Sequence, residues 1–584
     1  MKSKTTIIDI EMNAAAIDSK YDFFSFRTSK KYIARGARFL DFGGRAKAES
    51  IVFDYGVTAF AMFKKGIAKL ADLQNGISDG DIAVRRISVG EMKEHIIVRL
   101  LLNSLGNSNY DGFEFNNLTG RLYCFLPDWV SKNGKSLKAL DFSTTLLADG
   151  SIRLNANACT FTRVSCFKVK PDSRFPRYCV SLNGTMKRVF EGDPSYDSEG
   201  LFVRKTPDGK KTEIPFLDFS KGKQGSTRAA AIYKVVNSFN AKFRDLCSIS
   251  FRELEITKKL ESKRDEDFLE KSCASLTKLG FNIVNLDVNE EDRPDFRRLV
   301  ESLSRFLPGC PVKETDSLSG SVPNIVFLHN ADYYKENGYE DPYRTLPRNA
   351  AVQCVTEEDA GSSSSDAVIK TIIKELAIKQ DIIHGRRVTL DEWADFGFTS
   401  PLSFGMLQDE VPYFIEISPA GEISTIKPKG ISHTFFEEKY NEMKQDLLSA
   451  SDGGGVYLIS DGMNEIVISS TGINTLPDEE IFLSDSPRGK EARAKHLAGI
   501  TDINFYGGQE SKLYNVGVIG KGMNSSLPKG SILYKATAIK GGNFIEELLE
   551  SMSVMFVKYN SFTVLPYPIK YLREWVAMET LSQE

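Results

Sequence analysis

Apolar residues in the middle of the chain fall into short runs separated by stripes with helical spacing. The runs Gly280–Leu286, Pro323–Leu328 and Ala351–Thr356 are typical of buried strands. Helical spacing occurs at Pro294–Phe306 and again at Asp366–Gln380, where apolar positions recur at i, i+1, i+4 and i+5. This alternation predicts an α/β domain with a mainly parallel sheet, whose ligands bind beyond the carboxyl ends of its strands.

Beyond Trp393 the alternation of strands and helices returns, which predicts a second α/β block. We expect helices at Thr434–Ala450 and Asn543–Tyr559. The expected strands are Tyr413–Ser418, Gly421–Ile426, Gly455–Ser460, Glu465–Ser469, Ile481–Ser484, Tyr514–Ile519 and Ser531–Lys535.

The first half of the chain mixes helical and strand patterns, which predicts an α+β organisation. Helices are expected at Val89–Asn103 and Thr227–Leu246. Expected strands are Ser50–Tyr55, Val57–Phe63, Leu122–Leu126, Ser151–Asn155, Cys159–Lys168 and Tyr178–Leu182. The charged stretch Glu253–Lys271 is interpreted as a solvated helix or linker that contains a domain boundary. Together these patterns divide the chain into residues 1–110, 111–255, 256–395 and 396–584.

Composition limits the classes of function. A net charge of −3 and a pI near 6.1 argue against a protein that coats nucleic acid indiscriminately, but not against one that confines its basic residues to a channel. The eight cysteines form no Cys-x-x-Cys pair and the five histidines have no metal-ligand spacing. We therefore expect reduced thiols in a cytoplasmic protein without a metal centre. No run of about 18 apolar residues occurs, so a membrane partner is not expected.

Polar residues that could bind a phosphate lie around the third predicted strand of the first α/β block. Tyr343, Arg344 and Arg348 follow the second strand, and Gln353 lies within the third. Lys370, Lys374 and Lys379 lie on the next helix. Cations, a hydroxyl and an amide that converge near a helix N-terminus suit a terminal phosphate. The alternative is that the lysines face solvent and Gln353 is an ordinary strand residue.

The segment Asp341–Thr356, followed by Val368–Ile382, resembles the MID domain of prokaryotic Argonautes. In that family a Tyr-x-x-Lys pair, a strand glutamine and a helix lysine hold the 5′-phosphate of a guide strand. The resemblance implies that the guide phosphate is held by Tyr343, Arg344, Arg348, Gln353, Lys374 and Lys379. Leu346 stands where the pair has its lysine, so Arg344 or Arg348 replaces that lysine. The only cofactor implied is Mg²⁺ at the guide phosphate.

Two further segments resemble the PIWI domain of the same family, which is RNase H-like. They are Leu565–Trp575, with its Pro-x-Pro-x-x-Tyr spacing, and Gly455–Gly462, a strand that ends in Asp-Gly. The resemblance places Glu416, Asp461 and Arg573 at positions that hold two catalytic metal ions in active members. A guanidinium cannot ligate a metal, so no catalytic residue is expected. Glu416 as an outward strand carboxylate and Asp461 as a turn residue are the alternative interpretations.

The resemblance implies an α/β multidomain, Argonaute-like protein with a Rossmann-like MID domain and an RNase H-like PIWI domain. Its N-terminal half is compatible with N, linker and reduced PAZ-like regions. Such a protein would bind a short DNA or RNA guide, pair it with target DNA and recruit an effector protein. A helicase–nuclease of the kind found in DdmDE-type defence against plasmids or phage is one such effector. An active guide-directed nuclease and an RNase H-like scaffold without a guide are the alternatives.

Overall fold

The computed structural model forms two compact units, which are described separately. The first unit comprises Met1–Leu254, Ile473–Leu497 and Gly522–Gly530, and the second comprises Glu255–Gly472, Ala498–Lys521 and Ser531–Glu584. The structure describes residues 2–28, 46–54, 56–77, 82–106, 108–110, 113–118, 120–131, 134–167, 171, 175–180, 186–190, 192–205, 214–218, 222–261, 265–286, 294–347, 349–357, 366–388, 393–394, 397–409, 411–426, 435–450, 456–484, 486–487, 490, 502–507, 511–516, 526–527, 531–541, 556–558, 561–563 and 566–580.

The first unit contains an antiparallel sheet with strand order β3-β4-β2-β5. Its strands are β2 (Tyr21–Thr28), β3 (Ser50–Asp54), β4 (Thr58–Lys64) and β5 (Ile82–Ile87). Helix α4 (Glu94–Asn103) packs against β3 and β4, because almost its whole length is apolar and buried. The helix predicted from Val89 instead begins with a 3-10 turn, Val89–Glu91, whose Ser88 and Glu91 form a capping box.

A second antiparallel sheet is built around the long hairpin of β9 (Ser136–Leu146) and β10 (Ile152–Arg163). Two strands were predicted where β10 is one continuous strand, because Asn155 and Asn157 resemble turn residues although they pair with β9. Helix α5 (Arg228–Phe243) contacts β10. The remaining elements of this unit are β1 (Lys2–Met12), α1 (Ala14–Lys20), α3 (Leu70–Gly76), β6 (Ser108–Tyr110), β7 (Phe113–Leu118), β8 (Arg121–Val130), β11 (Arg177–Val180), β12 (Met186–Val189), β13 (Phe202–Val203), β14 (Leu217–Asp218), α12 (Glu479–Leu483) and β27 (Ser526–Leu527).

The sequence predicted a solvated helix or linker at the charged stretch Glu253–Lys271, but the structure has a strand followed by a helix there. Its first part belongs to β15 (Cys247–Glu261), and only its end lies in α6 (Asp265–Leu279). From Ile256 onward β15 pairs with β25 (Asp502–Tyr506). A partner so distant in sequence leaves no local signal, so charge alone gave the wrong element. The first boundary between the units, at Leu254, lies inside this stretch.

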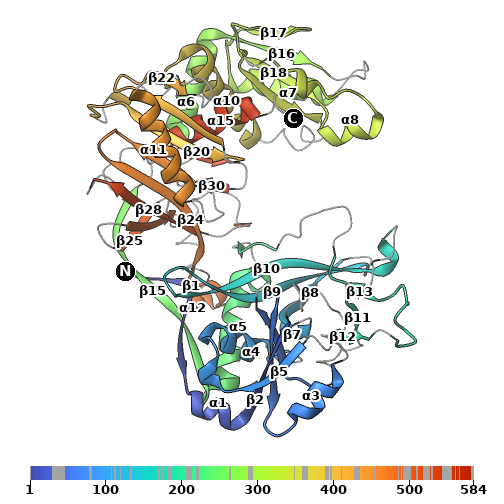
Figure 1. Ribbon diagram of the computed structural model, residues 1–584. Helices are drawn as coiled ribbons and strands as arrows, with labels where there is room; N and C mark the ends of the chain where they lie inside the picture. The colour runs from blue at the N-terminus through green and yellow to red at the C-terminus, as the bar shows by residue number, and fades with distance from the viewer. Residues whose placement is uncertain are drawn as a thin grey trace. The chain divides into compact units, whose positions relative to one another are not determined.

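The second unit opens with the parallel sheet expected from the sequence, in the order β17-β16-β18-β19 (Figure 1). The helices α7 (Pro294–Phe306) and α10 (Asp366–Gln380) have the predicted bounds. Their apolar stripes bury Leu299, Leu303 and Ile373 in one core with the sheet. The other elements here are β16 (Phe281–Asn285), β17 (Val312–Thr315), β18 (Asn324–Leu328), α8 (Ala331–Asn337) and β19 (Val352–Thr356), of which β17 and α8 were not predicted.

The rest of the second unit is a sheet covered by helices on both faces. Helix α11 (Phe435–Ala450) packs on one face through Tyr440 and Leu447, and α15 (Pro568–Thr580) packs on the other through Trp575. The described pairings of its strands are antiparallel, unlike those of the preceding block. The strands are β20 (Leu402–Gln408), β21 (Val411–Ile417), β22 (Ile423–Ile426), β23 (Val456–Ser460), β24 (Glu465–Leu476), β26 (Ser511–Val516), β28 (Ile532–Lys540), β29 (Phe556–Lys558) and β30 (Ser561–Thr563).

Two elements of the C-terminal part differ from their predictions. The apolar run Ile481–Ser484 is not a strand, because Asp478 caps a short helix by accepting a hydrogen bond from the Ile481 amide, and α12 results. The predicted helix Asn543–Tyr559 lies largely outside the described residues, and its described part, Phe556–Lys558, is strand β29 rather than helix. The mixture of parallel and antiparallel sheets makes the chain a multidomain α/β protein.

Candidate functional site

A small cavity of about 150 Å³ gathers several of the residues that the sequence singled out. It lies where β19 begins, α10 ends and the 3-10 turn Pro342–Thr345 passes. Its polar side chains are those of Tyr343, Arg344, Gln353 and Lys379. Its apolar wall consists of Leu346, Pro347, Ala350, Val352, Cys354 and Met578.

Lys379 is the cation of this cavity that hydrogen bonds to other lining residues. Its Nζ donates to Gln353 Oε1 at 2.8 Å and to the Val352 carbonyl at 2.9 Å. The amide nitrogen of Gln353 donates in turn to Glu375 at 3.2 Å. The ammonium is therefore held in place by two acceptors at the start of β19. A side chain held in this way binds an anion with less loss of conformational entropy than a free lysine.

Tyr343 contributes a neutral hydroxyl to the cavity. Asp341 fixes the turn that carries it, because its carboxylate accepts a hydrogen bond from the Tyr343 amide at 3.0 Å. Burial, together with Cys354, Glu574 and Asp341 nearby, raises the pKa of Tyr343 to about 12. The phenol consequently keeps its proton at neutral pH and can donate it to an anionic oxygen.

The C-terminal helix brings a second lysine and a counter-charge to the neighbourhood of the cavity. Lys570 donates to Glu375 at 2.8 Å and to Glu574 at 2.5 Å. Lys379 lies 3.8 Å from Glu574. Burial opposes the charge on Lys570, but Glu574 and Glu375 outweigh it and raise its pKa. The two lysines are thus balanced by two carboxylates, and an arriving anion has to compete with Glu574 for Lys379.

The structure separates the six phosphate-binding candidates. Tyr343, Arg344, Gln353 and Lys379 line the same cavity. Lys374 does not line it and is 4% exposed within the domain. Lys374 and Lys379 are five positions apart, about 140° around a helix, so they cannot both face Gln353. Arg348 lies outside the described residues.

The cavity also differs from the expected site in its position. Gln353 is near the amino end of β19 and Lys379 is in the last turn of α10, so the residues meet at a helix C-terminus rather than an N-terminus. The helix dipole there disfavours an anion, which leaves recognition to the side chains. Sequence reasoning missed Glu375, Lys570 and Met578. The i, i+4 pairs Glu375–Lys379 and Lys570–Glu574 were the available signal.

The three degenerate catalytic positions do not converge. Glu416, on β21, accepts hydrogen bonds from Ser403 at 3.1 Å and from Tyr440 of α11 at 3.2 Å. Arg573 is carried by α15, which packs on the opposite face of this sheet, where Trp575 contacts Tyr413.

Asp461 has a local structural role. Its carboxylate accepts hydrogen bonds from the amides of Met463 and Asn464 in the turn between β23 and β24. Burial opposes this charge, but the turn amides outweigh it and lower the pKa of Asp461. Among the described residues, no group of three or more His, Cys, Asp and Glu side chains is placed to hold a metal ion.

Glu416 instead belongs to a polar row beneath α11. The strand registers align it with Ser403, Ser460 and Glu465 across four neighbouring strands. Glu465 is 2% exposed. Its burial, together with the adjacent Asp446, raises its pKa to about 7, although Lys540 acts in the opposite direction. Lys540 lies 2.8 Å from Glu442 and 4.0 Å from Glu465, so an ammonium is placed among these carboxylates.

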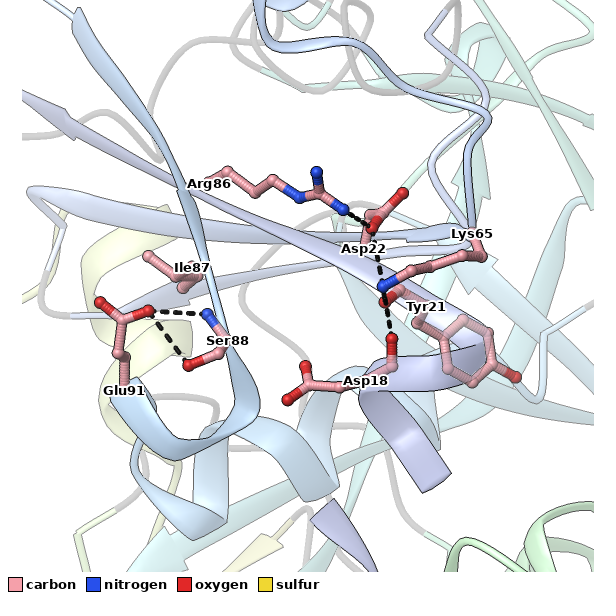
Figure 2. Close-up of a pocket in the computed structure, with 8 residues that line it drawn as sticks. All are labelled: Asp18, Tyr21, Asp22, Lys65, Arg86, Ile87, Ser88 and Glu91. Atoms are coloured by element: carbon pink, nitrogen blue, oxygen red, sulfur yellow. Dashed lines mark hydrogen bonds and ion pairs between the residues drawn. The ribbon is translucent and has the colours of Figure 1, made fainter. Parts of the chain in front are cut away.

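A second cavity, of about 330 Å³, lies in the first unit and is lined by charged groups that pair with one another (Figure 2). Asp22 accepts a hydrogen bond from the Gly66 amide at 2.7 Å and bonds from Lys65 and Arg86. Burial raises the pKa of Asp22, but these bonds outweigh it and lower the pKa overall. This network joins β2, β4 and β5 and explains the polar lining as structural.

No protein-family model matches the chain, and no curated protein matches its sequence. Each of the eight cysteines is a free thiol. In the described part of the chain, no helix combines the length and apolar character needed to cross a membrane.

Proposed function

We propose that this protein is a guide-binding, Argonaute-like protein that holds the 5′-phosphate of a short nucleic-acid strand and does not itself cleave. The observation that carries the proposal is the cavity that gathers Tyr343, Gln353 and Lys379 from three separate elements. The phenol and the ammonium can offer hydrogen-bond donors to phosphate oxygens, and the Gln353 amide holds that ammonium in place. The MID-like sequence around these residues supports the same reading.

The rest of the function follows as part of this proposal. The bound guide pairs with complementary target DNA, and base pairing supplies the sequence specificity. An effector protein such as a helicase–nuclease then acts on the target in defence against plasmids or phage. Binding without cleavage is supported by the separation of Glu416 from Arg573 across the sheet and by the structural role of Asp461.

Mg²⁺ at the guide phosphate receives no support from the cavity lining. The polar groups there are two cations, one phenol and one amide, whereas Mg²⁺ prefers several anionic or neutral oxygen ligands. We therefore propose a phosphate held by protein side chains alone.

Two variants with opposite expected effects test the proposed site. Affinities for a short single strand are compared between its 5′-phosphorylated and 5′-hydroxyl forms by fluorescence anisotropy. We expect wild type to prefer the phosphate by about tenfold or more, as for one charge-assisted hydrogen bond. Lys379→Met should abolish the preference. Glu574→Gln should increase it, because the carboxylate that competes for Lys379 is removed while Lys570 keeps Glu375.

Lys370→Met is the matched control, since Lys370 is on the same helix and does not line the cavity. Sequencing the copurifying nucleic acid should reveal a short 5′-phosphorylated species that the variant Tyr343→Ala with Gln353→Ala retains poorly. Equal affinity for both strand ends, or unchanged retention by that variant, would overturn the assignment. Target cleavage with Mg²⁺ or Mn²⁺ that Asp461→Ala abolishes would instead support the nuclease alternative.

A further inference from the structure

The first unit carries a cluster of arginines around one buried carboxylate. Arg121, at the start of β8, and Arg204, just after β13, donate to the same oxygen of Asp141 at 2.6 and 2.7 Å. Asp141 is 1% exposed, whereas the side chains of the two arginines are 49% and 36% exposed. The carboxylate therefore fixes one nitrogen of each guanidinium. Arg121 stays about half exposed, whereas Arg204 also lies over the Tyr123 ring at 5.4 Å and interacts with Cys159.

A third arginine is held beside this pair by α4. Arg99 donates to the Phe53 carbonyl at 3.3 Å. Asn103, one turn later, donates to the carbonyls of Ile51 and Gly120 at 3.0 and 2.8 Å, which fixes α4 against the residue before Arg121. Burial lowers the pKa of Arg99, and so does the positive charge of Arg121.

The cluster has a surplus of positive charge. Among the residues whose side chains the structure describes, the carboxylates that act on these guanidiniums are Asp141 and Asp54, so three cations face two anions there. The chain as a whole has a net charge of −3, which makes a local surplus of this sign unlike its average surface. Like charges held together cost free energy, and a bound anion relieves that cost.

A strip of uncharged hydrogen-bonding side chains continues from the cluster along the hairpin of β9 and β10. The register pairs Asp141 with Asn157, Ser143 with Asn155, and Thr145 with Arg153, and paired residues share one face of the sheet. Among the described residues of β8 to β10 that point to this face, Asp141 is the only carboxylate. Asp9 of the adjoining strand β1 shares the face of Ile7 and Arg153, but its carboxylate is paired with Arg252. Amide, hydroxyl and guanidinium donors are groups that contact nucleic-acid backbones.

We propose that this face, which we call the Arg121 face, binds the phosphodiester backbone of a nucleic acid without regard to its sequence. Arg121 and Arg204 present planar guanidiniums already oriented by Asp141, a geometry that matches phosphate oxygens. Arg99 adds charge, and Asn157 and Asn155 extend the contact along the strand. The site is in the first unit, and it shares no residue with the cavity of Tyr343, Gln353 and Lys379 in the second unit.

The salt dependence of binding tests this proposal on the full chain. A 5′-hydroxyl oligonucleotide, single-stranded or as a duplex, excludes any contribution from phosphate-end recognition. We expect Arg121→Gln and Arg204→Gln each to weaken binding about five- to tenfold at about 0.1 M salt. Each should also reduce the slope of log K against log salt by about 0.7 for the single strand or 0.9 for the duplex. The form of the oligonucleotide whose affinity the two variants lower more is the form that this face binds.

Arg27→Gln provides the control, because Arg27 is an exposed arginine on β2 in the same unit. Arg121→Lys keeps the charge and should retain most of the slope, which separates a lost contact from a lost fold. Lys370→Met, which lies in the second unit and does not line the cavity there, should leave binding of the 5′-hydroxyl strand unchanged. Affinity and slope that stay at the wild-type value in both glutamine variants overturn the proposal. The proposal is also overturned if the two glutamine variants lose binding of inorganic phosphate but bind the oligonucleotide as wild type does.

Discussion

Replacement of Lys570 by methionine is expected to lower the free energy of unfolding of the second unit by about 3 kcal/mol. Lys570 is 13% exposed and lies between Glu375 and Glu574. Its removal leaves two largely buried carboxylates close to each other with one fewer counter-charge, and breaking a buried pair in this way typically costs about 3–5 kcal/mol. Urea unfolding followed by the fluorescence of Trp393 and Trp575, both in this unit, measures the change.

The companion variants show whether unpaired charge is the cause. Glu375→Gln added to Lys570→Met removes one of the two carboxylates that lose their counter-charge. The double variant should therefore recover part of the lost free energy of unfolding. Lys335→Met, on the exposed surface of α8, should change stability by less than about 0.5 kcal/mol. A loss for Lys570→Met no larger than that of the Lys335 control would show that α15 is held to α10 by apolar packing alone.

Glu465 gives the second large effect, which depends on pH. Its pKa of about 7 in the folded protein lies above its ordinary value of 4.5, so the folded state holds a proton that the unfolded state loses first. Stability from this group is therefore unaffected below pH 4.5 and decreases as the pH rises toward 7. We expect a loss of about 1–2 kcal/mol as the pH rises from 5 to 8.

Glu465→Gln isolates this contribution. The variant should be more stable than wild type at pH 8, and the difference between the two should shrink by about 1–2 kcal/mol at pH 5. Asp446, Glu442 and Lys540 are the charged groups that face Glu465, so Lys540→Met should enlarge the pH dependence. Glu422→Gln, at an exposed position, serves as the control. A difference between wild type and Glu465→Gln that does not vary with pH contradicts the raised pKa of Glu465.

Sequence pattern predicted those elements whose stability is local. Helices α7 and α10 have the predicted bounds because their apolar stripes and flanking residues lie within the segments themselves. Strand β15 was not predicted, because its charged residues are compatible with a strand only once β25 lies beside it. The helix α12 was mistaken for a strand because four apolar or small residues outweighed a cap at Asp478 that the sequence also contains.

The candidate site shows the same division. Tyr343, Gln353 and Lys379 could be chosen from the sequence because they belong to neighbouring elements of one α/β block. The choice between Lys374 and Lys379 required the rotation of α10 about its axis, which only packing fixes. The i, i+4 pair Lys570–Glu574 indicates an ion pair on α15, but nothing in that pattern indicates that α15 packs against α10, so Lys570 and Met578 could not be placed at the cavity.

The cavity of Tyr343, Gln353 and Lys379 is completed by Met578 of α15, which has a consequence for synthesis on the ribosome. Glu375 and Lys570, which form an ion pair beside the cavity, are 195 residues apart in the chain. At about 5–20 residues per second, the segment with Tyr343 and Gln353 emerges roughly 10–40 seconds before the helix that completes the cavity wall. If the cavity holds a strand end as proposed, loading would begin only after Lys570 and Met578 have been synthesised. Polypeptides that stall before Lys570 would then not sequester short nucleic acids.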